Sequence, residues 1–164
     1  MDLFDDSFIE LWQQLNQYGV KYILVGGFAT NLHGYQRFTG DMDLYIEDTP
    51  NNRKSLRQAY KAYSKIDFEG FERIQFVPGW IDFPLNNGVR LDIMTSMKGV
   101  DVSFDECLRL AKSCDVNGVQ VSVLHINHLI ANKKAVGRPK DQLDVIYLEK
   151  IKKLREEEES ATES

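Results

Sequence analysis

Residues 22–46 constrain the fold of this chain more than any other segment, because they encode a strand, a glycine pair and a short helix in that order. The segment Tyr22–Val25 is apolar throughout and predicts a short buried strand. Gly26 and Gly27 follow it directly, and residues 28–33 then predict a short helix. This order brings the N-terminus of a helix to the end of a buried strand.

The glycine pair is the first candidate binding feature. Glycine at this position lets the backbone approach a ligand closely, and the helix N-terminus offers unpaired N–H groups to a phosphate. The alternative for Gly26 and Gly27 is a tight strand-to-helix turn that binds nothing. The pair alone does not decide between these two interpretations.

Two aspartates enter the next predicted strand, at residues 42–46. Asp41 and Asp43 are two residues apart, so strand geometry points both carboxylates to the same side. Two such carboxylates repel each other unless a cation lies between them, and hard oxygen ligands select Mg²⁺ or Mn²⁺ rather than zinc. The alternative is a solvated turn, which is the usual context of an isolated Asp-x-Asp.

A third acid, Asp92, lies at the end of an otherwise apolar predicted strand, where an unpaired carboxylate is costly. It is explained either by a salt bridge with an arginine such as Arg90 or by a role as a third metal ligand from an adjacent strand. Three carboxylates on two strands beside a phosphate loop form a two-metal site for phosphoryl transfer. Such an arrangement suits a nucleoside triphosphate held through its phosphates and magnesium.

The remaining elements give a mixed pattern, with helices around a small sheet. We expect further helices at residues 7–18 with Ser7 as N-cap, 50–63 with Thr49 as N-cap, 104–113, 127–136 with Asn127 as N-cap, and from Lys140 into the tail. We expect further strands at residues 71–77, at 81–93 with a turn at residues 86–88, and on both sides of Asn117-Gly118. Because this is not a regular βαβ alternation, the predicted class is α+β, a small mixed sheet flanked by helices and followed by C-terminal helices.

The length of 164 residues predicts a single domain over residues 1–155, with a catalytic core at about 7–100 and a helical part at about 101–155. The chain has no run of 18 or more apolar residues, and its acidic N-terminus lacks a signal-peptide pattern. Its two cysteines do not make a disulfide framework. These features predict a reduced, cytoplasmic protein without a membrane segment.

The net charge of −5 is carried by the tail. Removing the five glutamates of residues 156–164 leaves a body of zero net charge. The acidic tail is expected to be a frayed helix end or disordered. The neutral body argues against tight binding to duplex DNA, and no sequence-specific DNA binding is expected.

Two blocks of the sequence resemble known families. The glycine pair, the Thr39-Gly40-Asp41-Met42-Asp43 segment and the later Asp92 resemble the nucleotidyltransferase superfamily that includes DNA polymerase beta, antibiotic nucleotidyltransferases and minimal nucleotidyltransferases. The run at residues 129–144 is similar to that of the toxin-type, abortive-infection branch. That branch often has Gly-Ser before its aspartates, whereas this chain has Thr39-Gly40. The resemblance covers roughly residues 7–150.

The resemblance implies a nucleotidyltransferase fold and assigns roles to residues. Asp41, Asp43 and Asp92 would bind Mg²⁺ or Mn²⁺, and Asp92 would also help to deprotonate the acceptor. Lys133 would contact phosphate or the leaving pyrophosphate and is counted with the three aspartates as catalytic. The residues implied to bind the nucleotide are Gly26, Gly27, Thr39, Arg138 and Lys140. For the charged residues of the C-terminal block, the alternative is a solvated helix end.

The implied activity is transfer of a nucleoside monophosphate from a nucleoside triphosphate to a hydroxyl, with release of pyrophosphate. The acceptor can be a small molecule, an RNA end or a protein side chain, and the sequence does not choose among them. The competing interpretation is a fold relative that binds nucleotide without turnover and pairs with an antitoxin-like protein. Retention of all three aspartates favours the enzyme.

Overall fold

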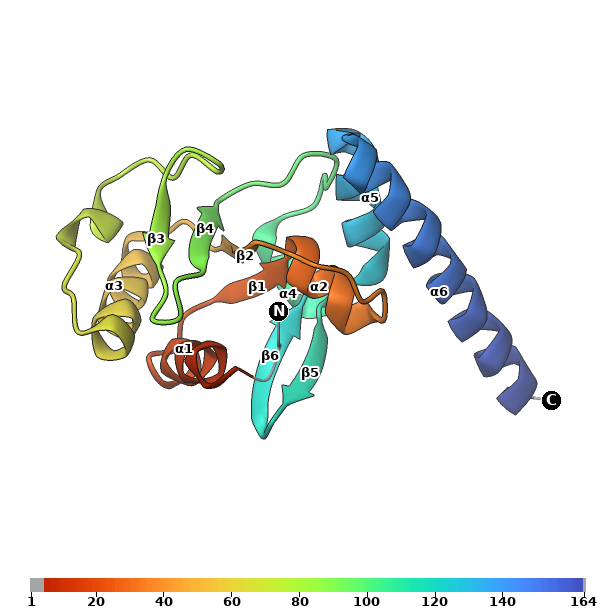
Figure 1. Cartoon of the computed structure of the whole chain (residues 1–164), viewed down its shortest axis with the longest axis horizontal. Helices are drawn as coiled ribbons and strands as arrows, with labels where there is room; N and C mark the ends of the chain where they lie inside the picture. The colour runs from red at the N-terminus through yellow and green to blue at the C-terminus, as the bar shows by residue number, and fades with distance from the viewer. Residues whose placement is uncertain (1–4, 164) are drawn as a thin grey trace.

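A six-stranded mixed sheet in the order β3-β4-β2-β1-β6-β5 forms the centre of the molecule (Figure 1). The computed structural model describes residues 5–163, so the first four residues and Ser164 lie outside the described part. The strands are β1 (Tyr22–Val25), β2 (Asp41–Ile46), β3 (Asp82–Pro84), β4 (Arg90–Met94), β5 (Lys112–Val116) and β6 (Val119–Val123). The helices are α1 (Asp6–Gln17), α2 (Gly26–His33), α3 (Pro50–Ser64), the 3₁₀ helix η1 (Glu69–Glu72), α4 (Phe104–Leu110), α5 (Ile126–Val136) and α6 (Pro139–Glu163).

Parallel and antiparallel pairs alternate in the sheet, which confirms the predicted α+β class with a mixed sheet. Strand β2 pairs antiparallel with β1 and parallel with β4. Strand β3 is antiparallel to β4, β5 is antiparallel to β6, and β6 is parallel to β1. The central strand β1 is buried over its whole length because it has a neighbour on each side and helices on its faces.

One row of register partners crosses four strands and positions the candidate site. Asp82 of β3 is paired with Asp92 of β4, Asp92 with Asp43 of β2, and Asp43 with Val25 of β1. Residues paired in register point to the same face of a sheet. The row therefore brings Asp43 and Asp92 close to Gly26, the residue that follows Val25, with Asp82 at the far end of the row.

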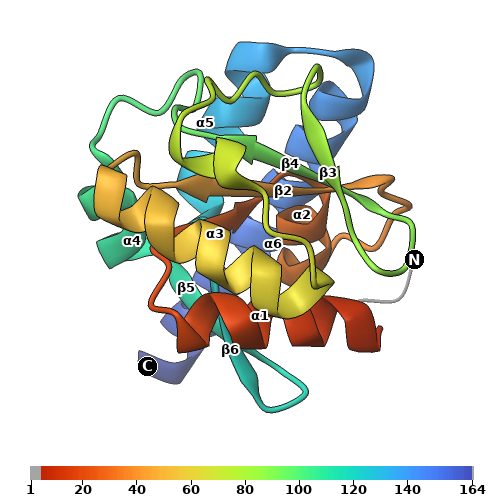
Figure 2. The same cartoon turned by 90° about the vertical axis from the view of Figure 1, so that its left-hand side faces the viewer.

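Helices cover both faces of the sheet. Helices α1 and α3 lie side by side over one face, and Figure 2 shows them in front of the strands. Helix α2 packs on β1 and β2 and contacts the α5–α6 pair on the other side. Large side chains such as Phe8, Trp12 and Phe28 are completely buried between these layers, and each contributes about 1.5–3 kcal/mol of hydrophobic stabilisation.

The expected strand at residues 71–77 is wrong. The chain forms η1 at Glu69–Glu72 and then runs without regular structure to the turn before β3. Phe71 and Phe76 are buried, and both rings pack against Phe83 of β3. The apolar character of this segment therefore reflects an aromatic cluster rather than strand pairing. The hairpin expected at residues 81–93 is confirmed as β3 and β4.

Several helix boundaries differ from the expected ones. The N-cap of α1 is Asp5, whose side chain accepts from the Ser7 N–H, rather than Ser7 itself. The N-cap of α5 is His125 rather than Asn127. Helix α4 ends at Leu110, because the residues that follow pair with β6 as strand β5. The Thr49 cap of α3 is confirmed, with Thr49 Oγ1 accepting from the Asn52 N–H.

Helix α6 extends beyond the body of the protein (Figure 1). It continues through the acidic residues to Glu163, where we expected a frayed helix end or a disordered tail. None of the helices within residues 5–163 has the length and apolar character needed to cross a bilayer.

Candidate active site

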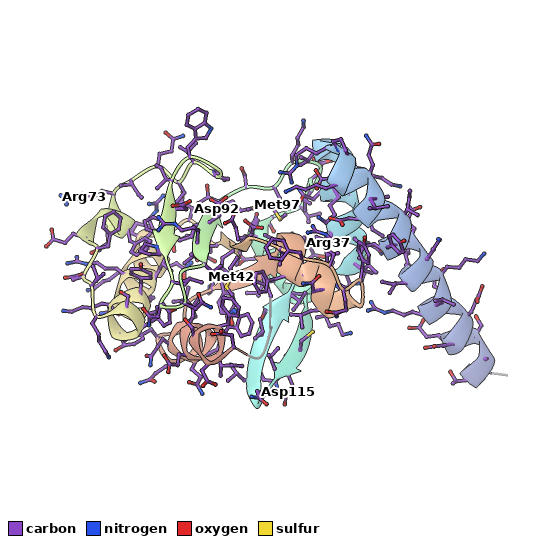
Figure 3. The ribbon with its side chains drawn as sticks, viewed as in Figure 1. Arg37, Met42, Arg73, Asp92, Met97 and Asp115 are labelled. Atoms are coloured by element: carbon purple, nitrogen blue, oxygen red, sulfur yellow. The ribbon has the colours of Figure 1, made fainter. Side chains whose placement is uncertain are left out.

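A cleft of about 400 Å³ lies between strands β1, β2 and β4 and the α5–α6 pair. The three predicted carboxylates line it together with one glycine and three basic residues from the predicted set: Asp41, Asp43, Asp92, Gly26, Lys133, Arg138 and Lys140. Figure 3 labels Asp92 and Met97, another lining residue, in the region between β4 and the α5–α6 pair. The structure therefore brings the two sequence blocks, which are about 40 residues apart along the chain, to one site.

The acidic wall is built by β2 and β4. Asp43 and Asp92 are register partners on these parallel strands, and Asp41 lies two residues before Asp43 on the same face. Asp92 Oδ2 accepts a hydrogen bond from the Gly79 N–H at 3.0 Å, but Asp92 Oδ1 is buried without a hydrogen-bond partner among the described residues. The expected alternative, an ion pair with Arg90, is wrong, because Arg90 Nε donates to Asp82 at 2.9 Å.

The electrostatics of this wall disfavour negative charge in the absence of a ligand. Burial, followed by the charges of Asp92 and Asp41, raises the pKa of Asp43 from its ordinary 3.8 to about 7. Burial also raises the pKa of Asp92, against the opposing hydrogen bond from Gly79. A divalent cation would fit this wall. It would bind the buried Asp92 Oδ1, which has no hydrogen-bond donor within residues 5–163, and neutralise the negative charge of Asp43 and Asp92.

The three aspartates line the same cleft, but their side chains do not converge on a single metal-binding position. Within residues 5–163, no group of three His, Cys, Asp or Glu side chains is arranged to hold a metal ion by itself. The chemistry of the donor set nevertheless fits Mg²⁺ or Mn²⁺, since all three side chains offer hard oxygen ligands.

The two glycines are required for different reasons. Gly26 has φ +67°, and a Cβ there would lie 2.1 Å from Asp43 Oδ2. A Cβ on Gly27 would lie 2.3 Å from Thr39 Oγ1. Gly26 lines the cleft, whereas Gly27 and Thr39 pack against each other, and Thr39 Oγ1 donates to the carbonyl of Asp41 at 3.3 Å. Of the predicted residues Gly26, Gly27 and Thr39, only Gly26 is thus placed on the cleft surface.

The N-terminus of α2 faces this cleft through Gly26. No side chain caps the helix, whose N-cap residue is Val25. The first N–H groups of a helix have no partner within it and favour a bound anion. The acidic wall and the uncapped N-terminus of α2 therefore lie next to each other.

The basic wall is organised by two buried aspartates. Lys133 Nζ lies 2.7 Å from Asp144 Oδ2 and 3.7 Å from Asp141 Oδ1, and its side chain is only 4% exposed. Arg138 Nε donates to Asp141 Oδ2 at 2.6 Å. Lys133 therefore reaches the cleft, as predicted, but as a member of a hydrogen-bonded network rather than as a free cation.

Arg37 and Asp144 are functional candidates that the sequence did not single out. Arg37 Nε and Nη2 donate to the two oxygens of Asp144, each at 2.7 Å, which ties the α2–β2 segment to α6. Figure 3 shows Arg37 beside the α5–α6 pair. Burial alone would raise the pKa of Asp144, but the hydrogen bonds from Arg37 and Lys133 outweigh burial and hold that pKa below its usual range.

Other candidates have structural roles. His33 donates through Nε2 to the Leu124 carbonyl at 2.7 Å, and burial lowers its pKa to about 4, so it is neutral and fixed. His125 caps α5. Tyr35 stacks on Tyr147 of α6 with ring centroids 4.2 Å apart. Trp80, in contrast, is exposed.

Comparisons with known proteins concern the family and the fold of the chain. Residues 5–162 match the model of a family described as "Nucleotidyl transferase of unknown function (DUF2204)". No curated protein matches the chain. A proposed nucleotidyltransferase from Thermotoga maritima has a similar fold, with a TM-score of 0.58, 13% identity, and coverage of 94% of this chain and 92% of that one. An antigenic nucleotidyltransferase-like protein from Paracoccidioides brasiliensis has a TM-score of 0.50 at 18% identity, covering 87% of this chain and 72% of that one.

Proposed function

The chain belongs to the nucleotidyl transferase family of unknown function that it matches over residues 5–162, and from this premise we propose that it is a Mg²⁺-dependent nucleotidyltransferase. It transfers a nucleoside monophosphate from a nucleoside triphosphate to a hydroxyl. The acceptor oxygen forms a bond to the α-phosphorus, and the bond from that phosphorus to the bridging oxygen breaks. Pyrophosphate leaves with the electron pair of the broken bond.

The observation that supports this proposal most is the state of the acidic wall. Asp43 and Asp92 are direct partners on adjacent strands, and Asp92 Oδ1 is buried without a donor. A structural pair of aspartates would be neutralised by a nearby cation, but Arg90, the expected partner, is bonded to Asp82. Lys133 and Lys140 lower the pKa of Asp43 by less than burial and the neighbouring carboxylates raise it. The wall is therefore built for a cationic ligand rather than for stability.

Asp41, Asp43 and Asp92 would hold the magnesium ions. When bound, the ions would supply charge neutralisation at the α-phosphate and orientation of the reacting oxygens. The same three carboxylates select a hard cation, and Gly26 keeps the backbone of α2 close to Asp43, since any side chain there would collide with it.

The other residues of the cleft bind and orient the triphosphate. The uncapped N-terminus of α2 at Gly26 offers N–H groups to phosphate oxygens. Lys133, Arg138 and Lys140 place positive charge on the opposite wall, toward the leaving pyrophosphate. Asp92 is also the candidate acceptor of the hydroxyl proton, because burial raises its pKa and makes it a stronger base.

Label transfer tests the proposal. The purified protein is incubated with α-labelled nucleoside triphosphate, Mg²⁺ and a cell extract as the source of acceptors. We expect label to enter an acceptor in the presence of Mg²⁺, and to be absent with EDTA or in the Asp43→Asn and Asp92→Asn variants. Lys134→Ala is the matched control, because Lys134 pairs with Glu149 on the exposed surface.

Two outcomes would contradict this proposal. Transfer that survives Asp43→Asn at wild-type rates would exclude this residue from the site. Mg²⁺-dependent binding of triphosphate without transfer to any component of the extract would instead identify a nucleotide-binding protein that has no turnover.

A further inference from the structure

Trp80 is the most exposed large apolar side chain within residues 5–162, with 88% of its surface accessible. It lies beside the candidate active site, because the two residues before it, Pro78 and Gly79, line the cleft. The only other tryptophan, Trp12, is fully buried. Trp80 thus presents an aromatic surface at the rim of the site with no protein side chain stacked on it among the described residues.

The backbone that carries Trp80 is fixed to the acidic wall. The Gly79 N–H donates to Asp92 Oδ2 at 3.0 Å. The N–H groups of Trp80 and Ile81 both donate to the Val77 carbonyl at 3.1 Å, which closes the turn. The backbone at Trp80 is therefore held at a defined place relative to Asp92, which keeps the indole close to the acidic wall.

The order of the strands places Trp80 and Gly26 on opposite sides of the carboxylates. Across the sheet from β3 to β1, the turn that carries Trp80 comes first, then Asp92, then Asp43, and finally Gly26 at the start of α2. Figure 1 shows β3 on one side of this row and the α5–α6 pair on the other. The basic residues of the cleft, Lys133, Arg138 and Lys140, belong to the α5–α6 side. The anion-binding groups and Trp80 thus lie on opposite sides of the carboxylates.

We propose that Trp80 is the stacking platform for the acceptor, and that the acceptor is a nucleoside carrying a free ribose hydroxyl. This inference rests on the proposed function, in which the triphosphate occupies the Gly26 side of the row. The acceptor then approaches from the side of β3, where Trp80 is the exposed aromatic surface next to the cleft. Bases stack on aromatic side chains regardless of sequence.

The depth of the site favours a nucleoside over a protein tyrosine. Trp80 lies outside the cleft, whereas Asp43 and Asp92 are partly buried within it. The acceptor must therefore carry its aromatic ring and its hydroxyl on separate parts of the molecule. A nucleoside has this form, since the ribose places its hydroxyls away from the base, whereas the hydroxyl of tyrosine is bonded to the ring itself.

Binding measurements without turnover test the platform. The probes are a single-stranded RNA oligonucleotide with a free 3′ hydroxyl and the free nucleoside adenosine, titrated against the wild type while its tryptophan emission is followed. The affinities of the wild type and the variants are compared by isothermal titration calorimetry, which does not need Trp80 as a reporter. We expect quenching by at least one probe, and the two titrations distinguish an RNA end from a free nucleoside as the source. Trp80→Ala should weaken binding of that probe at least about fivefold, the equivalent of about 1 kcal/mol of base stacking, and Trp80→Phe should retain most of it.

Phe38→Ala is the matched control, since Phe38 is also exposed, at 76%, but lies on the segment that Arg37 ties to α6. Its affinity for the probe should equal that of the wild type. The inference is overturned if neither probe quenches the emission, if Trp80→Ala binds as well as the wild type, or if Phe38→Ala loses as much affinity. Stabilisation by Mg²⁺ and triphosphate is measured on the same variants. If that stabilisation persists while probe binding fails, the platform is rejected and the proposed function stands.

Discussion

Replacing Asp43 by asparagine should stabilise the unliganded protein, although the same change should abolish activity. Asp43 has its pKa raised from 3.8 to about 7 by burial and by the charges of Asp92 and Asp41. Each pKa unit corresponds to about 1.36 kcal/mol, so keeping this carboxylate ionised in the folded state at pH 8 costs about 4 kcal/mol. Asparagine has nearly the same shape and carries no charge.

The sign of the pH dependence follows from the raised pKa of Asp43. Below about pH 4, both the folded and the unfolded states hold the proton, and the carboxyl costs no stability. Between about pH 4 and pH 7, only the folded state holds it, so the free energy of unfolding of the wild type falls as the pH rises. Above about pH 7 the loss is complete.

The prediction is best measured as a difference between two pH values. In urea titrations with EDTA, the stability advantage of Asp43→Asn over the wild type should be about 2–3 kcal/mol larger at pH 8 than at pH 5. Groups elsewhere titrate in both proteins and cancel. Asp41→Asn removes the same charge from an exposed position and should change stability by no more than about 0.5 kcal/mol.

A variant no more stable than the wild type at pH 8, or an advantage that does not change with pH, would refute this reasoning. Either result would mean that the charge of Asp43 is already compensated in the unliganded protein. The acidic wall would then be a structural ion-pair site, and the argument for a metal ion would lose its main support.

Three further predictions follow from the cleft. Mg²⁺ with triphosphate should stabilise the wild type by about 2.7 kcal/mol at a hundredfold excess over Kd, and triphosphate with EDTA much less; equal melting shifts would contradict a carboxylate–metal clamp. Gly26→Ala should lose this Mg²⁺-dependent shift, because a Cβ there meets Asp43 Oδ2 at 2.1 Å, whereas Gly40→Ala meets nothing within 4 Å and should keep it. Lys133→Ala should weaken triphosphate binding far more than Lys134→Ala, measured by isothermal titration on folded samples, and similar losses would mean that only general electrostatics is at work.

The part of the site near the start of the chain was predictable because its signals are local. An apolar strand followed by Gly26 and Gly27 leaves few alternatives to a tight turn into a helix, and the structure confirms β1 and α2. Asp41 and Asp43 are two apart, so their common face follows from strand geometry alone. That Asp92 joins them depends on the pairing of β4 with β2, which the sequence offered only as one of two explanations for an acid in an apolar strand.

The errors arose where tertiary packing overrides local pattern. Phe71 and Phe76 suggested a strand, but their rings fill an aromatic cluster around Phe83 and the backbone between them is not paired. A helix from Lys140 into the tail was predicted, but its end was expected to be frayed or disordered, whereas α6 is helical through the glutamates to Glu163. The composition of a short segment does not predict how aromatic rings pack against a distant strand or how far a helix continues.

The sequence did not predict the ion-pair partners of the basic residues. These partners, Asp141 and Asp144, lower the net positive charge of the basic wall. Arg37 and Asp144 are 107 positions apart, yet they form the bidentate pair that fixes the neighbouring Lys133. Together with Arg138 and Asp141, the network has three cations and two anions, so its net charge is only +1. In the proposed function, the basic wall would therefore bind a triphosphate less through its net charge than through the fixed positions of Lys133 and Arg138. Such preorganised groups act on charge that develops during a reaction, which is what the transfer of a nucleotidyl group to a hydroxyl requires.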